Sequence, residues 1–188
     1  MRMRNLFEDR TIEKDTALSP SKRSEAEQQV LLACLDEVGI GEKQVVGELT
    51  GCDFTGHGEE SLQQTIAFLE KELQGFLPET LADFVAVNRV RVPVRSTFCL
   101  DERFILLSKG ELDASFQDSQ GWERFRMLYP ASYGVVDISR VGFDAPGHQA
   151  LIYTGLQVDW DMGHGEYRLF EKSGGRWEKT ESALAWMS

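Results

Sequence analysis

The stretch from Gly134 to Ser188 decides the fold, and it reads GVVDISRVGFDAPGHQALIYTGLQVDWDMGHGEYRLFEKSGGRWEKTESALAWMS. Two turn signals, Ala145-Pro146-Gly147 and Ser173-Gly174-Gly175, lie between runs that are rich in β-branched and aromatic residues. The pattern predicts four strands, at 134–143, 149–158, 165–171 and 176–186. Connections this short require neighbouring strands to be antiparallel. The sequence therefore predicts a C-terminal four-stranded antiparallel meander.

The part of the chain before this stretch carries helical patterns. One apolar stripe recurs at i, i+4, i+7 and i+11 and consists of Leu62, Ile66, Leu69 and Leu73. Pro78 predicts the start of the next helix, and Ser108 with Glu111 predicts a capping box. Short runs at 44–49 and 104–107 predict two more strands. The predicted class is α+β, with N-terminal helices packed on one face of the meander, and the last hairpin is cystatin- or NTF2-like by analogy.

Length and periodicity indicate one folded unit preceded by a tail. Residues 1–20 have no apolar periodicity and end in a Ser-Pro-Ser cluster, which predicts a mobile N-terminal tail. Residues 21–188 are then expected to form a single α+β domain, because a chain of 188 residues is long enough for one buried core.

Charge and cysteine usage limit the expected partners and compartment. The net charge is −11, and residues 1–80 hold most of the excess acid. An acidic surface repels phosphate backbones and anionic lipids, so neither nucleic acid nor membrane is expected as a partner. No apolar run approaches the length of a membrane span. Three cysteines far apart in the sequence favour a reducing compartment, and the predicted localisation is cytoplasmic.

Several blocks of the sequence resemble a widespread family of uncharacterised bacterial proteins with the pattern SRVGFN…QALVYV…GxGxYxLLxKxxGxWxV…WIS. The blocks in this chain are Ser139–Phe143, Gln149–Tyr153, Gly163–Tyr167, Gly174–Trp177 and Trp186–Ser188. The chain differs from the pattern at Asp144, where the family usually has Asn. The family has no assigned activity, so the resemblance implies a fold and a bacterial source but no chemistry.

The sequence contains no nucleophile elbow, phosphate loop, paired-carboxylate signature or metal-ligand cluster. His57 and His164 are each flanked by glycines, which allows a sharp turn or an acid–base role in a loop. Cys52, Asp53 and His57 share one loop, but a single Cys-x4-His pair is a weak zinc signal. We therefore expect no metal and no cofactor.

A ligand pocket is predicted at the mouth of the meander. Strand alternation in a simple register places Arg140 and Tyr153 side by side, and the turn from Trp160 to His164 overhangs the next strand. The predicted lining combines one cation, a titratable ring and three aromatic side chains: Arg140, Tyr153, Trp160, His164 and Tyr167. Such a lining suits a small polar or anionic ligand. In the alternative interpretation, Arg140 is neutralised by a nearby acid such as a helix carboxylate.

Three functions remain open at this point. The first is a non-enzymatic domain that binds a small ligand or a protein. The second is a small hydrolase or isomerase that uses His57 or His164 as a base in a sheet pocket. The third is an acidic immunity-type protein that neutralises a basic partner, and it depends on the net charge alone.

Overall fold

The structure is a computed structural model that describes residues 18–38, 42–117 and 121–188. Within them the helices are α1 (Pro20–Val38), α2 (Gly58–Glu72), α3 (Pro78–Asn88), α4 (Val94–Thr97), α5 (Lys109–Ser115) and α6 (Trp122–Leu128). The strands are β1 (Lys43–Gly47), β2 (Phe104–Leu107), β3 (Ser132–Ile138), β4 (Gly142–Phe143), β5 (Gln149–Asp159), β6 (Met162–Ser173) and β7 (Arg176–Met187). The fold is α+β, as predicted.

The sheet is mixed and larger than the predicted meander. Its strand order is β2-β1-β3-β5-β6-β7, and β4 pairs with β5. The pairs β3–β5, β5–β6 and β6–β7 are antiparallel, whereas β1 runs parallel to both β2 and β3. The prediction of a four-stranded antiparallel sheet was therefore wrong, because it left out the two strands that join from earlier in the chain.

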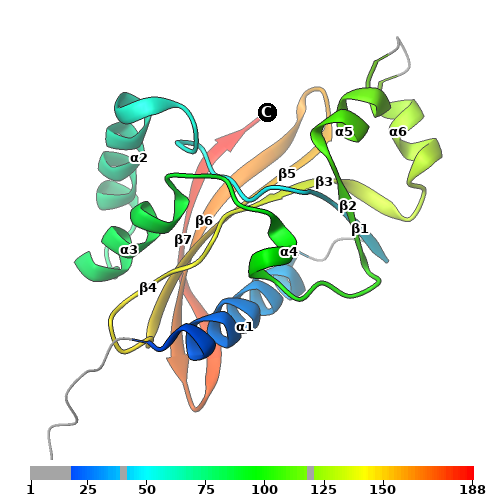
Figure 1. Cartoon of the computed structure of the whole chain (residues 1–188). Coiled ribbons are helices and arrows are strands. Elements are labelled where there is room, and N and C mark those ends of the chain that lie inside the picture. Colours follow the sequence, from blue (N-terminus) through cyan, green and yellow to red (C-terminus); the bar gives the residue numbers. More distant parts are fainter. Residues whose placement is uncertain (1–17, 39–41, 118–120) are drawn as a thin grey trace, which may run out of the picture.

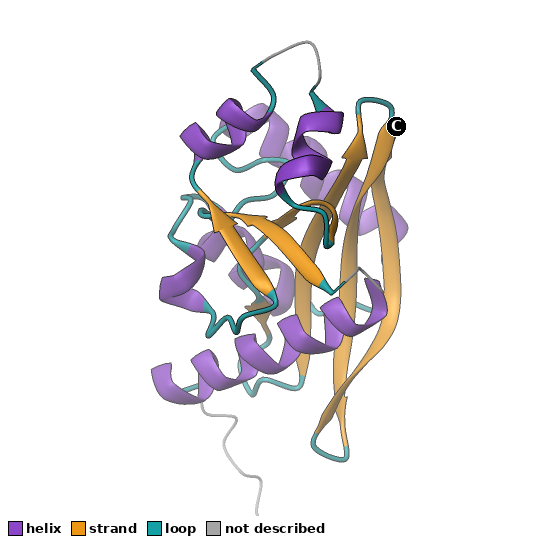
Figure 2. Ribbon diagram, turned by 90° about the vertical axis from the view of Figure 1, so that its right-hand side faces the viewer, coloured by secondary structure: helices purple, strands orange, loops and turns teal. Residues whose placement is uncertain are grey.

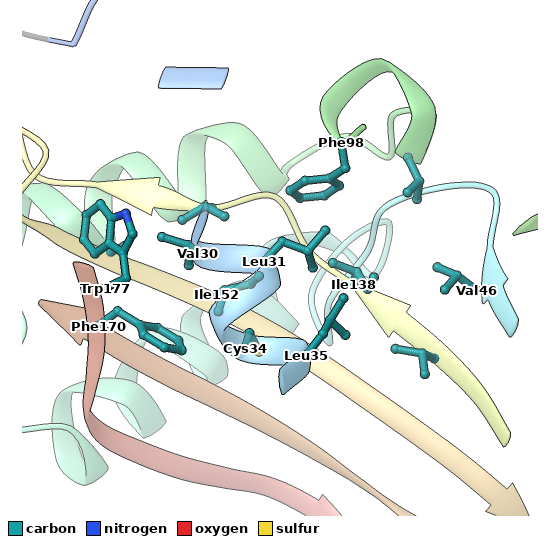
Figure 3. Close-up of a cluster of buried hydrophobic side chains, with 14 of the residues drawn as sticks. Val30, Leu31, Cys34, Leu35, Val46, Phe98, Ile138, Ile152, Phe170 and Trp177 are labelled. Atoms are coloured by element: carbon teal, nitrogen blue, oxygen red, sulfur yellow. The ribbon is translucent and has the colours of Figure 1, made fainter. Parts of the chain in front are cut away.

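Helices cover both faces of the sheet, which corrects the prediction of a single covered face (Figures 1 and 2). On one face, here called the α1 face, α1 packs against Val46, Val136 and Ile152. Figure 3 shows Leu31 and Cys34 of α1 between Phe170 on one side and Ile138 on the other. On the opposite face, α2 and α3 pack over β5 and β6, and α6 packs over β1 and β3. Parallel strands need cover on both faces, and β1 shows this with Val45 and Val46 buried in different clusters.

The local signals for turns and helix ends are confirmed. Gly174 and Gly175 have φ of 56° and 84°, so the β6–β7 turn uses the left-handed region that glycine adopts without strain. Pro78 begins α3, where its missing N–H would have no intrahelical partner. The capping box of Ser108 and Glu111 is present at the start of α5.

The predicted strand 134–143 is interrupted after Ile138. The side chain of Ser139 accepts a hydrogen bond from the Tyr153 backbone N–H at 2.8 Å, and the N–H of Arg140 donates to Asn88 Oδ1 at 2.8 Å. These bonds replace the regular ladder, so the chain bends there and resumes as β4.

Two further predictions were a mobile N-terminal tail and the absence of a membrane-spanning segment. Most of the tail, residues 1–17, lies outside the described residues, and α1 already begins at Pro20. Among the helices described here, none has the length and apolar character needed to cross a bilayer.

Candidate functional site

The structure does not bring the five predicted site residues together. Ile138 pairs with Thr154, so Arg140 shares a face with the even-numbered residues of β5 and not with Tyr153. Its guanidinium donates to the buried carboxylate of Glu27 on α1, at 2.8 Å. The predicted single pocket is therefore wrong, and Arg140 pairs with a helix acid, as the alternative interpretation held.

The other four residues lie in two further places. Tyr153 and Tyr167 pack together on the face opposite α1, with ring centroids 4.9 Å apart. His164 is half-buried on β6, where it pairs with Leu156 and Met187. Trp160 is 70% exposed, and its ring packs edge-on against Phe116. Only the two tyrosines are neighbours.

A cavity of about 470 Å³ opens elsewhere, on the face opposite α1. It lies where the three mutually parallel strands β1, β2 and β3 reach their carboxyl ends, beside α5. Its lining consists of Gly47, Glu48, Leu49, Arg91, Leu107, Lys109, Leu112, Asp113 and Asp137. The carboxyl ends of parallel strands are where open sheets commonly bind ligands. The volume is within the range of small-molecule sites.

The residues on the floor of this cavity are part of a row of paired residues that runs across neighbouring strands of the sheet. Asp137 pairs with Gly155, which pairs with Gly165, and Gly165 pairs with Trp186. On the other side of Asp137, the pairing of Val136 with Val46 makes Gly47 the next residue of the row. We call Gly47, Asp137, Gly155 and Gly165 the glycine row. Neither neighbouring residue of Asp137 in the row has a side chain of its own, but Tyr153 and Trp186 cover Gly155, so only the Gly47 side is open.

The two ends of the glycine row differ in what covers them. A Cβ on Gly165 would collide with the Trp186 indole, which donates to the Tyr153 hydroxyl at 2.9 Å. A Cβ on Gly47 would meet only the Asp137 Oδ1 atom at 3.6 Å and a backbone oxygen at 4.0 Å. The row is therefore filled at the β6 end and open at the β1 end, inside the cavity.

Asp137 is the acidic group on this floor. Its side chain is reached by solvent through the cavity, but the surrounding protein limits its hydration and raises the pKa of the carboxyl above its usual value. The positive charge of Arg91 opposes this shift only in part. Within the described residues, the carboxylate has no hydrogen-bond or ion-pair partner. An exposed carboxylate that has a raised pKa and lies in a cavity without a protein partner can accept hydrogen bonds from a ligand and is a candidate functional group.

Arg91 forms the cationic wall of the cavity. Its guanidinium lies against Gly51, where a Cβ would stand 3.3 Å from Cζ. The segment that carries it is fixed by backbone bonds between Thr50 and Val92 and between Val94 and Glu48. None of the five charged side chains of the lining forms an ion pair with a described residue, whereas Glu27 and Arg168, which are buried, do. The cavity therefore presents both signs of charge without neutralising them internally.

A second polar cluster lies beyond the closed end of the row. Tyr167 donates to Asp53 at 3.5 Å, and burial raises the pKa of Asp53 while bonds from both tyrosines lower it. Burial also raises the pKa of Cys52 to about 12, so its thiol stays protonated and is a poor nucleophile. This cluster touches the cavity floor, since Tyr153 Oη and Asp137 Cβ both lie within 4 Å of where a Cβ on Gly155 would be.

Neither predicted histidine base lines the cavity. His57 is exposed at the start of α2, and His164 lies on the α1 face of β6. Across the described ranges, no group of three His, Cys, Asp or Glu side chains has the arrangement of a metal site. The lining supplies charged groups and leucines, which suit recognition of a polar ligand by hydrogen bonds and charge.

Comparison with known protein families, with curated proteins and with solved structures gives no match. The function has to be argued from the cavity itself.

The sequence interpretation did not identify Asp137 and Arg91 as site residues. One signal was present, because Asp137 is an acid within an otherwise apolar run on β3. The glycines beside it gave no signal, because they come from strands far apart in the chain. Only the pairing of β1, β3 and β5 places them in one row.

Asp137→Asn should raise the melting temperature at pH 7. In the folded protein the pKa of Asp137 is raised, so the native state holds this proton more tightly than the unfolded chain. The Asp137 side chain therefore contributes most to stability below the pKa that it has in the unfolded chain. This contribution is lost as the pH rises through the higher pKa of the folded protein. Asparagine does not ionise, so the variant does not lose stability in this way as the pH rises. Thermal melts from pH 3 to pH 8 should show a gain over wild type that grows with pH.

The matched control is Asp161→Asn, at an exposed position in the β5–β6 turn. It should give no pH-dependent gain. A lower melting temperature for Asp137→Asn at pH 7 would mean that Asp137 has a stabilising partner and would contradict the description of the site.

Proposed function

We propose that this protein is a non-enzymatic binding domain that holds a small polar ligand in the cavity at the carboxyl ends of β1, β2 and β3. The proposal depends on one observation above all. The Asp137 carboxylate stands between two glycines on the floor of a 470 Å³ cavity, near Arg91 but without an ion pair to it among the described residues. A ligand with hydrogen-bond donors would satisfy this carboxylate, and three leucines of the lining would cover its apolar part.

The types of residue that line the cavity favour a non-enzymatic binding domain over an enzyme. The lining contains no Ser, Thr, Cys or His among the residues that the structure describes. The charged side chains of the lining can bind and orient a ligand through charge-assisted hydrogen bonds. The alternative of a hydrolase or isomerase with a histidine base is not supported by any contact of His57 or His164 with this cavity.

The test is ligand-observed NMR of the full chain against a library of small polar metabolites, comparing wild type with Gly47→Leu. Because a Cβ on Gly47 meets no close neighbour, leucine there should extend into the cavity without disturbing the strand. We expect at least one compound to bind wild type and to bind Gly47→Leu at least tenfold more weakly. The matched control is Gly110→Leu, on α5, where a Cβ meets nothing within 4 Å. If no compound binds, or if binding is the same in Gly47→Leu, the proposal is wrong.

A further inference from the structure

The charges of the cavity restrict the class of ligand. Asp137 lies on the floor, and Arg91 and Lys109 supply two cations from different elements. Glu48 and Asp113 add two more carboxylates to the lining. A simple anion would be repelled by the three acids, and a simple cation would be repelled by Arg91 and Lys109. A ligand with one group of each sign avoids both costs.

Arg91 and Asp137 are suited to opposite groups of such a ligand. A guanidinium donates two parallel hydrogen bonds to a carboxylate, and the absence of a side chain at Gly51 leaves room for the Arg91 guanidinium. A carboxylate beside a glycine can accept bonds from an ammonium group that approaches closely, and Gly47 provides that access to Asp137 from the cavity. These two residues can therefore hold a carboxylate and an ammonium group at once.

The remaining lining is apolar. Leu49, Leu107 and Leu112 come from the β1 end, the β2 end and α5, so they surround the space from three elements. Leu49 is 38% exposed, and covering it with a ligand would remove apolar surface from water. An aliphatic side chain would contact these leucines while the charged ends meet Asp137 and Arg91.

We infer that the ligand is an aliphatic zwitterion of the amino-acid or dipeptide class, with its ammonium group on Asp137, its carboxylate on Arg91 and its apolar side chain against the leucines. This inference depends on the proposed function, because it assigns a ligand class to the same cavity. A cavity of this volume exceeds a single aliphatic amino acid, so a dipeptide also fits by size.

The experiment measures dissociation constants by titration calorimetry or NMR for L-leucine and L-leucyl-L-leucine. Two analogues of leucine each lack one charged group: 3-methylbutylamine has no carboxylate and 4-methylpentanoate has no amine. We expect one of the zwitterions to bind, and leucine or the dipeptide to exceed both analogues by at least tenfold. Asp137→Asn should weaken the zwitterion by at least tenfold but should not weaken 4-methylpentanoate. Arg91→Met should weaken the zwitterion but should not weaken 3-methylbutylamine.

Each control makes the same substitution at a residue that does not line the cavity. Arg95→Met on α4 and Asp161→Asn in the β5–β6 turn should leave all dissociation constants within twofold of wild type. If other library compounds bind in a Gly47-dependent manner but neither zwitterion does, the ligand class is wrong and the binding function stands. If 3-methylbutylamine binds as tightly as the zwitterions, the role of Arg91 is wrong. If nothing binds at all, the proposed function and the ligand class both fail.

Discussion

Glu27→Ala should lower the free energy of unfolding by about 3–5 kcal/mol, the range for removing one partner of a buried ion pair. Glu27 is only 2% exposed on α1, and its carboxylate accepts from Arg140 at 2.8 Å and from Arg23 at 3.4 Å. Removing it leaves Arg140 partly buried without its acid, whereas Arg23 keeps Asp83 at 2.8 Å. A urea titration at pH 7 measures the change.

The matched control for this variant is Glu25→Ala, two residues away on the same helix. Glu25 is exposed and contacts only Gln29 among the bonds described, so its loss should cost at most about 0.5 kcal/mol. Glu27→Gln should fall between the two, because the amide keeps one hydrogen-bond acceptor but not the charge. Equal effects of Glu27→Ala and Glu25→Ala would show that the ion-pair network does not stabilise the contact of α1 with the sheet.

Trp177→Ala should also cost about 3–5 kcal/mol, because truncating a large buried aromatic side chain leaves a cavity. Trp177 is 8% exposed at the start of β7, and its ring lies 5.8 Å from that of Phe143 in the cluster under α1 (Figure 3). Lys172 lies over the other part of the ring, with Nζ 5.5 Å from the centroid. The midpoint of a denaturant titration should therefore fall steeply.

Two further variants show whether the ring or its polar atom matters. Trp177 Nε1 has no hydrogen-bond partner among the described residues, so Trp177→Phe should lose much less stability than Trp177→Ala. Trp160→Ala is the control for removing an indole from the surface, since Trp160 is 70% exposed. An unchanged midpoint for Trp177→Ala would place this side chain outside the core and contradict the structure.

Much of the local structure could be predicted from the sequence. The β6–β7 turn follows from Gly174 and Gly175, which adopt φ values that other residues avoid. The start of α5 follows from Ser108 and Glu111, whose side chains satisfy the first backbone N–H groups. Each of these features depends on residues within four positions of one another, and such short-range contacts leave a direct pattern in the sequence.

The candidate site could not be predicted in the same way. Arg140 was expected beside Tyr153, but the register of β3 and β5 assigns them to opposite faces, and a change of one position would have reversed this. The wrong expectation came from a register that no local residue specifies.

The sequence by itself determined α2, α3 and α5, the β6–β7 turn, the antiparallel order of the last three long strands and the α+β class, because propensity, capping and glycine conformation act locally. Only the tertiary structure decided that β1 inserts between β2 and β3, that helices cover both faces, and that Gly47, Asp137 and Gly155 meet in one row. Parallel pairing joins β1 to β2 across 60 residues and to β3 across about 90, and it depends on burying both faces of β1 at once. That requirement belongs to the assembled sheet, and it is also what forms the cavity around Asp137.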